Sequence, residues 1–358
     1  MKRPVLSAPA TEATDVRADV DRVLDDFLHE RHRAAAAASS GTLPLIEEIE
    51  RTIRSGGKRL RPLFCYWGYR AGGAEDDRVL PAAASLELLH TFALVHDDVM
   101  DRSTIRRGQP SSYRRLARDA GSSSSDPDRF GVSAAILAGD LANVLADALF
   151  LEAPFEADRM IAAAAIVQAM RAEVVGGQYL DVLAAATGRA TVSEARRVAF
   201  LKSGGYTVEK PLLIGATLAG SDDDVLTALS AFGIPLGEAF QLRDDVLGAF
   251  GDAAVTGKDG ESDFREGKQT LLIALARENA AADDVQFLDD RLGRPDLSAD
   301  EVARLRALLR ASGALAEVND MIGRLRARAL DALAQAPIPG EAVRALTDLA
   351  HDVVERDS

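Results

Sequence analysis

Apolar residues recur every three to four positions from Val16 almost to the C-terminus, which is the period of an α-helix. No segment of useful length has the alternation of a half-buried strand, and the sequence contains no internal repeat. Glycine, proline and small polar residues interrupt the pattern at residues 55–57, 72–73, 107–110, 204–205 and 337–340. The pattern therefore predicts an all-α fold in which long helices are joined by short connections.

The N-terminal residues and one internal segment lack this pattern. Residues 1–14 contain Pro4, Pro9 and small polar side chains, so we expect a flexible arm there. Residues 15–358 are expected to form one domain, a single large helical bundle, with a mobile loop at about 119–128 (DAGSSSSDPD). Residues 132–151 and 212–218 are apolar nearly all round, which is typical of helices at the centre of a large bundle.

Composition limits the partners and the compartment. The net charge of −14 argues against nucleic acid and anionic membranes as main partners, because both attract basic surfaces. Cys65 is the only cysteine, so no intrachain disulfide can form. The N-terminus lacks the apolar stretch of a signal peptide, and no run approaches the roughly 18 apolar residues of a membrane span. We therefore expect a soluble, cytoplasmic protein with no membrane span.

Three acids stand at the C-terminal end of the helix predicted over residues 82–100. Asp97 and Asp101 lie one helical turn apart and share a face, whereas Asp98 points about 100° away. The helix dipole disfavours negative charge at this end, which suggests that a cation binds there. Carboxylate oxygens suit Mg²⁺ better than zinc. Taken alone, such a cluster more often marks a solvated acidic helix end.

Basic residues near this cluster favour a ligand. Arg102, Arg106 and Arg107 follow the acids directly, and a guanidinium is well suited to phosphate oxygens. The acids could bind a metal ion and the arginines could bind phosphate oxygens. Together they predict a site for a metal-bound diphosphate.

A second acid pair, Asp244 and Asp245, again follows an apolar helix. Lys258 and Lys268 lie downstream of it among glycines, which allow the chain to turn tightly and approach a ligand. A third basic segment, RSGGKRLRP at residues 54–62, places four cations around a Gly-Gly turn. Two acid clusters and three basic loops in one helical bundle point together to a diphosphate-binding enzyme.

The sequence resembles the trans-isoprenyl diphosphate synthase, or polyprenyl synthetase, family from about Ile46 to the C-terminus. The segments that carry the resemblance occur in family order: GGKRLRP, HTFALVHDDVMDRSTIRRG, GGQYLD, LKSGGYTVEKP, QLRDDVLGAFGD, TGK and SDFREGKQT. The KSGGYTVEKP form resembles actinobacterial geranylgeranyl diphosphate synthases. The resemblance implies a helical bundle of the isoprenoid synthase type with a central active-site cavity.

The resemblance also implies roles for individual residues. The diphosphate of isopentenyl diphosphate would be held by Lys58, Arg61, His90 and Arg107. Three Mg²⁺ ions would bind the allylic diphosphate, two of them at Asp97 and Asp101 and the third at Asp244. The same diphosphate would be clamped by Arg106, Lys202 and Lys258. Further polar groups of the active site would be Asp98, Asp245, Ser203, Gln241, Lys268, Gln178 and Asp181, although the last pair also fits a satisfied buried polar pair.

The implied reaction is head-to-tail condensation of the two diphosphates. Cations stabilise the departing diphosphate, the isopentenyl double bond attacks the allylic carbocation, and a proton is lost. An apolar cavity must exclude water from the cation. Two departures from the family pattern stand out: Gly248 replaces the third Asp of the second acidic motif, and Ser203 replaces a threonine. We expect the first to weaken metal binding without abolishing activity.

The product length depends on the space below Asp97. Ala93 lies one helical turn below and Leu89 two turns below, and a small residue at the first position leaves room for a longer chain. Phe92 matches the family pattern for a twenty-carbon product. We therefore expect geranylgeranyl diphosphate, with farnesyl diphosphate and a longer polyprenyl diphosphate as the alternatives.

Three other functions fit the sequence less well. A class I terpene cyclase has no use for the second diphosphate site of Lys58, Arg61 and Arg107. A non-catalytic subunit of a heteromeric prenyltransferase usually lacks acids of the first motif, which are intact here. A di-metal carboxylate bundle requires Glu-x-x-His pairs, which the sequence lacks. The family resemblance further implies a homodimer.

Overall fold

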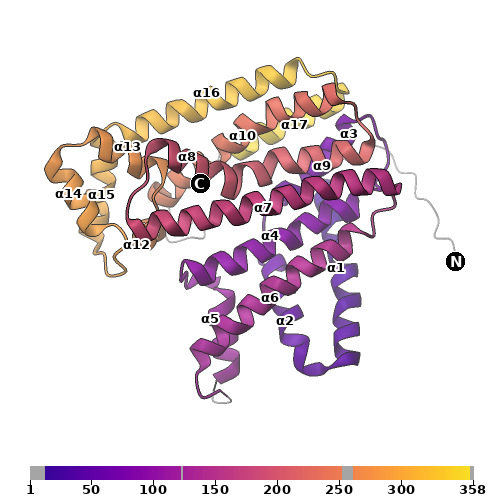
Figure 1. The fold of residues 1–358 in the computed structure, drawn as a ribbon, viewed down its shortest axis with the longest axis horizontal. Helices are drawn as coiled ribbons and strands as arrows, with labels where there is room; N and C mark the ends of the chain where they lie inside the picture. Colours follow the sequence, from indigo (N-terminus) through magenta and orange to yellow (C-terminus); the bar gives the residue numbers. More distant parts are fainter. Residues whose placement is uncertain (1–12, 122–123, 252–260, 355–358) are drawn as a thin grey trace.

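The computed structural model describes residues 13–121, 124–251 and 261–354. Helices dominate the described chain, which confirms the all-α prediction (Figure 1). In chain order the elements are α1 (Ala13–Ala38), η1 (Ser40–Thr42), α2 (Leu43–Arg54), α3 (Leu60–Ala71), α4 (Leu80–Met100), β1 (Ile105–Arg106), β2 (Gln109–Pro110), α5 (Ser112–Ala120), α6 (Pro127–Phe150), α7 (Ala157–Thr187), α8 (Val192–Ala199), η3 (Phe200–Glu209), α9 (Lys210–Ala219), α10 (Asp223–Phe250), α12 (Ser262–Glu266), α13 (Leu271–Asn279), α14 (Ala282–Arg291), α15 (Ala299–Ala311), α16 (Ala314–Ala334) and α17 (Gly340–Val354).

Two segment boundaries in the structure differ from those predicted from the sequence. The first helix, α1, begins at Ala13, and residues 1–12 of the predicted arm lie outside the described residues. The loop expected at about 119–128 is shorter, because α5 extends to Ala120 and α6 begins at Pro127, where Asp126 accepts a hydrogen bond from the backbone N–H of Arg129. Residues 122–123 of that loop lie outside the described residues.

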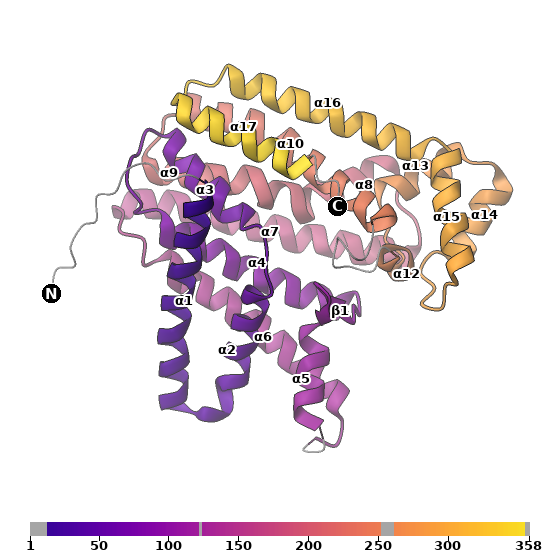
Figure 2. The same ribbon diagram turned by 180° about the vertical axis from the view of Figure 1, so that it is seen from behind.

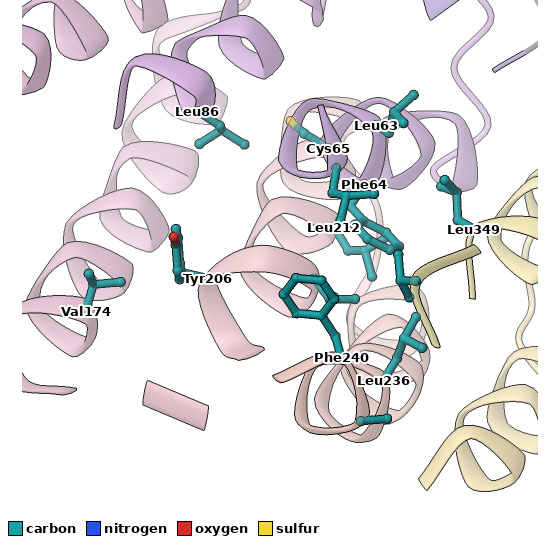
Figure 3. Close-up of a cluster of buried hydrophobic side chains, with 14 of the residues drawn as sticks. Leu63, Phe64, Cys65, Leu86, Val174, Tyr206, Leu212, Leu236, Phe240 and Leu349 are labelled. Atoms are coloured by element: carbon teal, nitrogen blue, oxygen red, sulfur yellow. The ribbon is translucent and has the colours of Figure 1, made fainter. Parts of the chain in front are cut away.

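The core surrounds the central helices α3, α9 and α10. Phe64 of α3 lies beside Leu212 of α9, and Leu236 and Phe240 of α10 belong to the same buried cluster (Figure 3). Helices α16 and α17 cover one side of this core, whereas α1, α2 and α5 extend away from it (Figures 1 and 2). The apolar segment 212–218 lies in α9 and is almost wholly buried, as predicted.

Two glycine contacts allow α3 and α9 to pack backbone against backbone. A Cβ on Gly215 would lie 1.9 Å from the carbonyl oxygen of Cys65, and one on Gly68 would lie 2.2 Å from that of Leu212. Any side chain at either position would therefore force the two helices apart.

The break expected at residues 204–205 is wrong. Gly204 and Gly205 lie inside η3, a π-helix that joins α8 to α9 without interruption. A Cβ on Gly204 would lie 2.7 Å from the carbonyl oxygen of Gly237 on α10, so this glycine allows two helices to touch and does not form a turn. Sequence pattern alone cannot separate these two uses of glycine.

The prediction that residues 132–151 lie at the centre of the bundle is also wrong in part. Helix α6 packs on α4 with one face, but Leu137 and Val144 on its other face are 56% and 62% exposed. By length and composition alone, α6, α7 and α10 are each long and apolar enough to cross a membrane. In the fold, 28% of the most apolar stretch of α7 and 44% of that of α6 are buried, so both helices present apolar faces outward.

Candidate active site

A cavity of about 460 Å³ lies between α4, α7, α8, η3 and α10. Residues 57–61, the β1–β2 hairpin, Asp263 of α12 and residues 268–270 contribute the rest of its wall. One part of the wall is apolar and includes Leu94, Val174, Val198 and Phe240, while the remainder is densely charged. The cavity therefore combines an ionic region with a hydrocarbon-like region.

Asp97 lies at the centre of the ionic region. Its Oδ1 atom is 2.8 Å from Lys202 Nζ, and its Oδ2 atom accepts a hydrogen bond of 3.2 Å from Arg106 Nη2. Lys202 Nζ also donates to Asp181 Oδ2 at 2.6 Å, so one ammonium joins α4 to α7. Gly177 permits this approach, because a Cβ there would lie 2.5 Å from the backbone nitrogen of Lys202.

Asp98 points away from the cavity, as the helical spacing predicted. It is only 2% exposed, and its Oδ1 atom accepts a hydrogen bond of 2.9 Å from Arg106 Nε. The Asp98 carboxylate therefore orients the Arg106 guanidinium toward Asp97 and does not line the cavity.

Asp101 meets the C-terminal part of the chain through Lys268. Lys268 Nζ lies 3.6 Å from Asp101 Oδ2, 3.4 Å from Asp263 Oδ1 and 2.9 Å from Glu266 Oε2. Ser103 donates a hydrogen bond of 2.7 Å to Glu266 Oε1, which ties the same two regions together. The buried oxygens Asp97 Oδ1, Asp101 Oδ2 and Glu266 Oε2 therefore each face a lysine ammonium, that of Lys202 or Lys268.

The neighbouring acids of α4 titrate differently. Burial disfavours ionised Asp97, but Lys202, Lys268 and Arg106 outweigh it and hold the pKa of Asp97 well below its usual range. Burial, followed by the charge of Asp97, raises the pKa of Asp101 to about 7. Burial and the nearby Asp263 raise the pKa of Asp245 on α10 to about 8. Two carboxyl groups of the site thus hold protons near neutral pH.

The second acid pair lies at the end of α10. Asp244, Asp245 and Gly248 all line the cavity, and Gln241 donates a hydrogen bond of 2.7 Å to Asp245 Oδ1. This pair and the acids of α4 therefore border the same cavity, although 147 positions separate Asp97 from Asp244.

Basic and aromatic groups form another part of the cavity wall. Arg61 Nη2 donates a hydrogen bond of 2.8 Å to Thr207 Oγ1, and the Arg61 guanidinium stacks 4.1 Å from the ring centre of Tyr206. His90 Nδ1 lies 3.1 Å from the Tyr206 hydroxyl. Burial and the charges of Arg61 and Arg107 lower the pKa of His90 well below its ordinary value, so its imidazole is neutral at pH 7.

Arg107 is held at the edge of this basic region. It adopts a left-handed backbone conformation (φ 52°) in the β1–β2 hairpin, and its guanidinium donates to Ser55 Oγ and to the carbonyl oxygen of Gly56. The hairpin thus lies against the Gly-Gly turn that precedes Lys58.

The structure brings most of the predicted site residues to this one cavity. Those that line it are Lys58, Arg61, His90, Ala93, Asp97, Arg106, Arg107, Gln178, Asp181, Lys202, Ser203, Gln241, Asp244, Asp245 and Lys268. Asp98, Asp101, Leu89 and Phe92 are not among its lining residues, and Lys258 lies outside the described residues.

Phe92 and Leu89 lie elsewhere in α4. The Phe92 ring packs edge-on against His96 with ring centres 4.9 Å apart, and Leu89 is 2% exposed in the core. Ala93 and Leu94 are the apolar residues of α4 that line the cavity.

Several lining residues were missed by the sequence analysis. They include Glu87, Tyr206, Phe240, Asp263, Gln269 and Thr270. Glu87 lies one helical turn before His90, and this spacing was the available signal for it. Nothing local to the sequence distinguishes Tyr206 or Phe240 from other core aromatics.

The oxygen-rich acids suit Mg²⁺, but they do not form a closed metal cage. Among residues 13–121, 124–251 and 261–354, no group of three or more His, Cys, Asp or Glu side chains is placed to hold a metal alone. Magnesium is commonly held by one or two carboxylates together with substrate phosphates, and the carboxylates of Asp97 and Asp101, one helical turn apart on α4, fit that arrangement.

Comparison with known proteins identifies the family. The polyprenyl synthetase family model matches residues 44–309. The chain belongs to the polyprenyl synthetase family. It is thus a prenyltransferase, and the resemblance noted in its sequence is confirmed.

The relatives of this family member differ in their products. A geranylgeranyl pyrophosphate synthase from Corynebacterium glutamicum, solved with isoprenyl diphosphate and magnesium, is 34% identical, with a TM-score of 0.92 over 97% of this chain and 100% of that one. Geranylfarnesyl diphosphate synthase of Aeropyrum pernix is 34% identical over 85% of this chain and 92% of its own length. (2E,6E)-Farnesyl diphosphate synthase of Mycobacterium tuberculosis is 31% identical over 84% and 80%.

Binding of Mg²⁺ is expected to release protons at pH 7. The raised pKa values of Asp101, about 7, and Asp245, about 8, leave both groups partly protonated, and a bound cation favours their ionised forms. Calorimetric titration with Mg²⁺ in buffers of different ionisation enthalpy measures this release. It should diminish by pH 9, where both groups are already ionised, and Asp245→Asn should reduce it at pH 7. An enthalpy that is independent of the buffer at pH 7 would contradict the expectation.

Proposed function

We propose that this chain catalyses the Mg²⁺-dependent head-to-tail condensation of isopentenyl diphosphate with allylic diphosphates, and that its main product is geranylgeranyl diphosphate. The observation that carries the proposal is the division of one cavity into two ionic regions beside an apolar wall. Carboxylates and lysines around Asp97 and Asp244 suit a metal-bound diphosphate, whereas Arg61, Arg107 and Lys58 suit a second diphosphate without metal.

The Corynebacterium relative supports this assignment, since it was solved with isoprenyl diphosphate and magnesium and matches 97% of this chain. We infer three Mg²⁺ ions per site, two at Asp97 and Asp101 and one at Asp244. Bound Mg²⁺ would neutralise the charge that develops on the departing diphosphate.

The protein side chains perform the remaining tasks. Arg106 and Lys202 are fixed by Asp98 and Asp181, so they present their charges to the allylic diphosphate without reorganising. His90 stays neutral, and when Tyr206 donates to its Nδ1 atom the imidazole keeps an N–H donor on Nε2 for the isopentenyl diphosphate. The apolar wall of Leu94, Val198 and Phe240 excludes water from the allylic cation.

Product length is proposed to depend on Ala93 more than on Phe92 or Leu89. Ala93 is a small residue in the cavity wall one turn below Asp97, so it leaves space for the growing chain. Phe92 instead packs on His96, and Leu89 belongs to the core. The proposal of a twenty-carbon product rests on the space that Ala93 leaves in the cavity and on the similarity to the geranylgeranyl pyrophosphate synthase from Corynebacterium glutamicum.

We also propose that the protein is a cytoplasmic homodimer. Exposed apolar residues follow α6 at intervals of seven, at Phe130, Leu137, Val144 and Leu151, and Val175 and Val182 repeat this spacing on α7. Seven-residue spacing aligns apolar side chains for packing against another helix, and a second copy would remove both faces from water.

Purified protein incubated with Mg²⁺, labelled isopentenyl diphosphate and farnesyl diphosphate is expected to form a twenty-carbon diphosphate, identified by chromatography of the dephosphorylated products. Asp97→Ala should lower the rate by about 10²–10³-fold, because it removes a group that anchors charge at the departing diphosphate. Asp128→Ala, at an 82% exposed side chain, is the control. Correctly folded protein that elongates no allylic primer would overturn the proposed function.

Ala93→Phe is expected to shift the main product from geranylgeranyl to farnesyl diphosphate, because the ring fills the space below Asp97. Phe92→Ala is the matched variant on the neighbouring residue and should leave the product distribution unchanged. Longer products from Phe92→Ala, with no effect of Ala93→Phe, would assign chain length to Phe92 instead.

Sedimentation velocity is expected to show a dimer, and the double variant Leu137→Glu/Val144→Glu should sediment as a helical monomer because it introduces charge into the α6 face. Ile234→Glu changes an exposed apolar residue of α10, 42% exposed, and should remain dimeric. A wild-type monomer at micromolar concentration would refute the dimer.

A further inference from the structure

One side of α2 carries a row of polar residues. Glu48, Thr52 and Ser55 follow one another at spacings of four and three positions, so they lie along one face of the helix and its C-terminal cap. The Thr52 hydroxyl oxygen lies 3.5 Å from that of Ser112 at the start of α5. Ser55 Oγ accepts a hydrogen bond of 3.3 Å from Arg107 Nη1. The row therefore faces the β1–β2 hairpin and the first turn of α5.

Glu48 and Arg115 form a buried ion pair at the centre of this contact. Glu48 is 1% exposed and Arg115 is 8% exposed. The Arg115 guanidinium donates to both carboxylate oxygens of Glu48, with Nε 3.1 Å from Oε2. Its Nη1 atom donates to the carbonyl oxygen of Pro110 in β2. One guanidinium therefore fixes the hairpin relative to α2.

The hairpin is too short to set its own position. Each of its strands has two residues, and an isolated two-stranded hairpin is at best marginally stable in water. Its turn places Arg107 (φ 52°) and Gly108 (φ 71°) in the left-handed region, which is unfavourable for a residue with a side chain. Such a conformation persists only where the surrounding structure imposes it. The position of Arg107 therefore depends on the contacts that the hairpin makes with α2 and α5.

The two arginines of the hairpin are held differently. Arg106 donates to two carboxylates of α4, to Asp98 at 2.9 Å and to Asp97 at 3.2 Å. Arg107 instead contacts a hydroxyl and a backbone carbonyl oxygen of residues 55–56. A shift of the hairpin would therefore displace Arg107 more than Arg106.

We propose that Glu48 and Arg115 are positioning residues of the isopentenyl diphosphate site, and that their ion pair fixes the place of Arg107 relative to that substrate. This inference rests on the proposed function. A buried ion pair adds little net stability, because both charges lose their hydration. What this pair adds is geometry, since a planar guanidinium that binds a carboxylate through two hydrogen bonds has one orientation. Apolar side chains would fill the same volume without fixing the hairpin.

Steady-state kinetics of a double variant tests the inference. Glu48→Leu/Arg115→Met replaces the ion pair by apolar side chains, so its melting temperature should equal or exceed that of wild type. Its KM for isopentenyl diphosphate, at saturating farnesyl diphosphate, should rise about 10–100-fold, because Arg107 is displaced. Its KM for farnesyl diphosphate and its kcat should stay within about threefold of wild type. Arg115→Lys keeps the charge but not the planar fork, and it should raise the KM for isopentenyl diphosphate about three- to tenfold.

Two further comparisons separate positioning from folding. In an Arg107→Gln background, the double variant should raise the KM for isopentenyl diphosphate by less than about twofold, because the group that the ion pair positions is gone. Arg70→Met/Glu341→Leu is the matched control, since it removes a 3.1 Å ion pair between α3 and α17, and it should keep the wild-type KM.

The inference is overturned by an unchanged KM for isopentenyl diphosphate in the folded double variant, by an equal rise of both KM values, or by a full effect in the Arg107→Gln background. If the double variant does not fold, a wild-type KM for isopentenyl diphosphate in Arg115→Lys overturns it alone. Wild-type protein that elongates no primer would instead overturn the proposed function, so the two failures are distinguishable.

Discussion

The structure depends on keeping buried charges of both signs in contact within one small cavity. An isolated buried charge costs several kcal/mol, so each acid that faces the cavity needs a cation nearby. Lys202 meets Asp97 and Asp181, and Lys268 meets Asp101, Asp263 and Glu266. These ammonium groups come from segments far from α4 in sequence, so the charged region exists only when the whole bundle is assembled. The same contacts hold the Asp97 and Asp101 carboxylates close together, and carboxylate oxygens suit a divalent cation.

Close backbone packing is what brings those segments together. Gly177 allows α7 to approach η3 beside Lys202, and Gly204 allows η3 to approach α10. The π-helix itself has wider turns than an α-helix, and such segments occur often at functional sites. In η3 it carries Lys202, Ser203 and Tyr206 to the cavity wall within five residues. Small residues and an unusual helix thus position the most strongly charged part of the site.

The ionic part and the apolar part of the cavity are under different physical constraints. The ionic part is constrained by charge pairing, because each buried carboxylate needs a nearby cation or hydrogen-bond donor. The apolar part is constrained only by volume, since methyl and methylene groups contact a prenyl chain without directional bonds. Relatives near 30% identity accordingly include farnesyl, geranylgeranyl and geranylfarnesyl diphosphate synthases. The product can therefore differ between members of the family without a change of fold.

The sequence by itself determined the all-α fold and the local parts of the site. The spacing of Asp97, Asp98 and Asp101 indicated which carboxylates share a face, because helical geometry acts over a single turn. Only the tertiary structure decided which distant groups meet, as with Arg61 and Thr207 or Gly248 and Asp263. In the sequence, Gly204 and Gly205 looked like a break between helices, although they lie inside η3. The apolar face of α6 looked like part of the core, although it faces outward. The spacing and composition of a segment show how apolar a helix face is. Which surface that face packs against depends on segments that are distant in sequence.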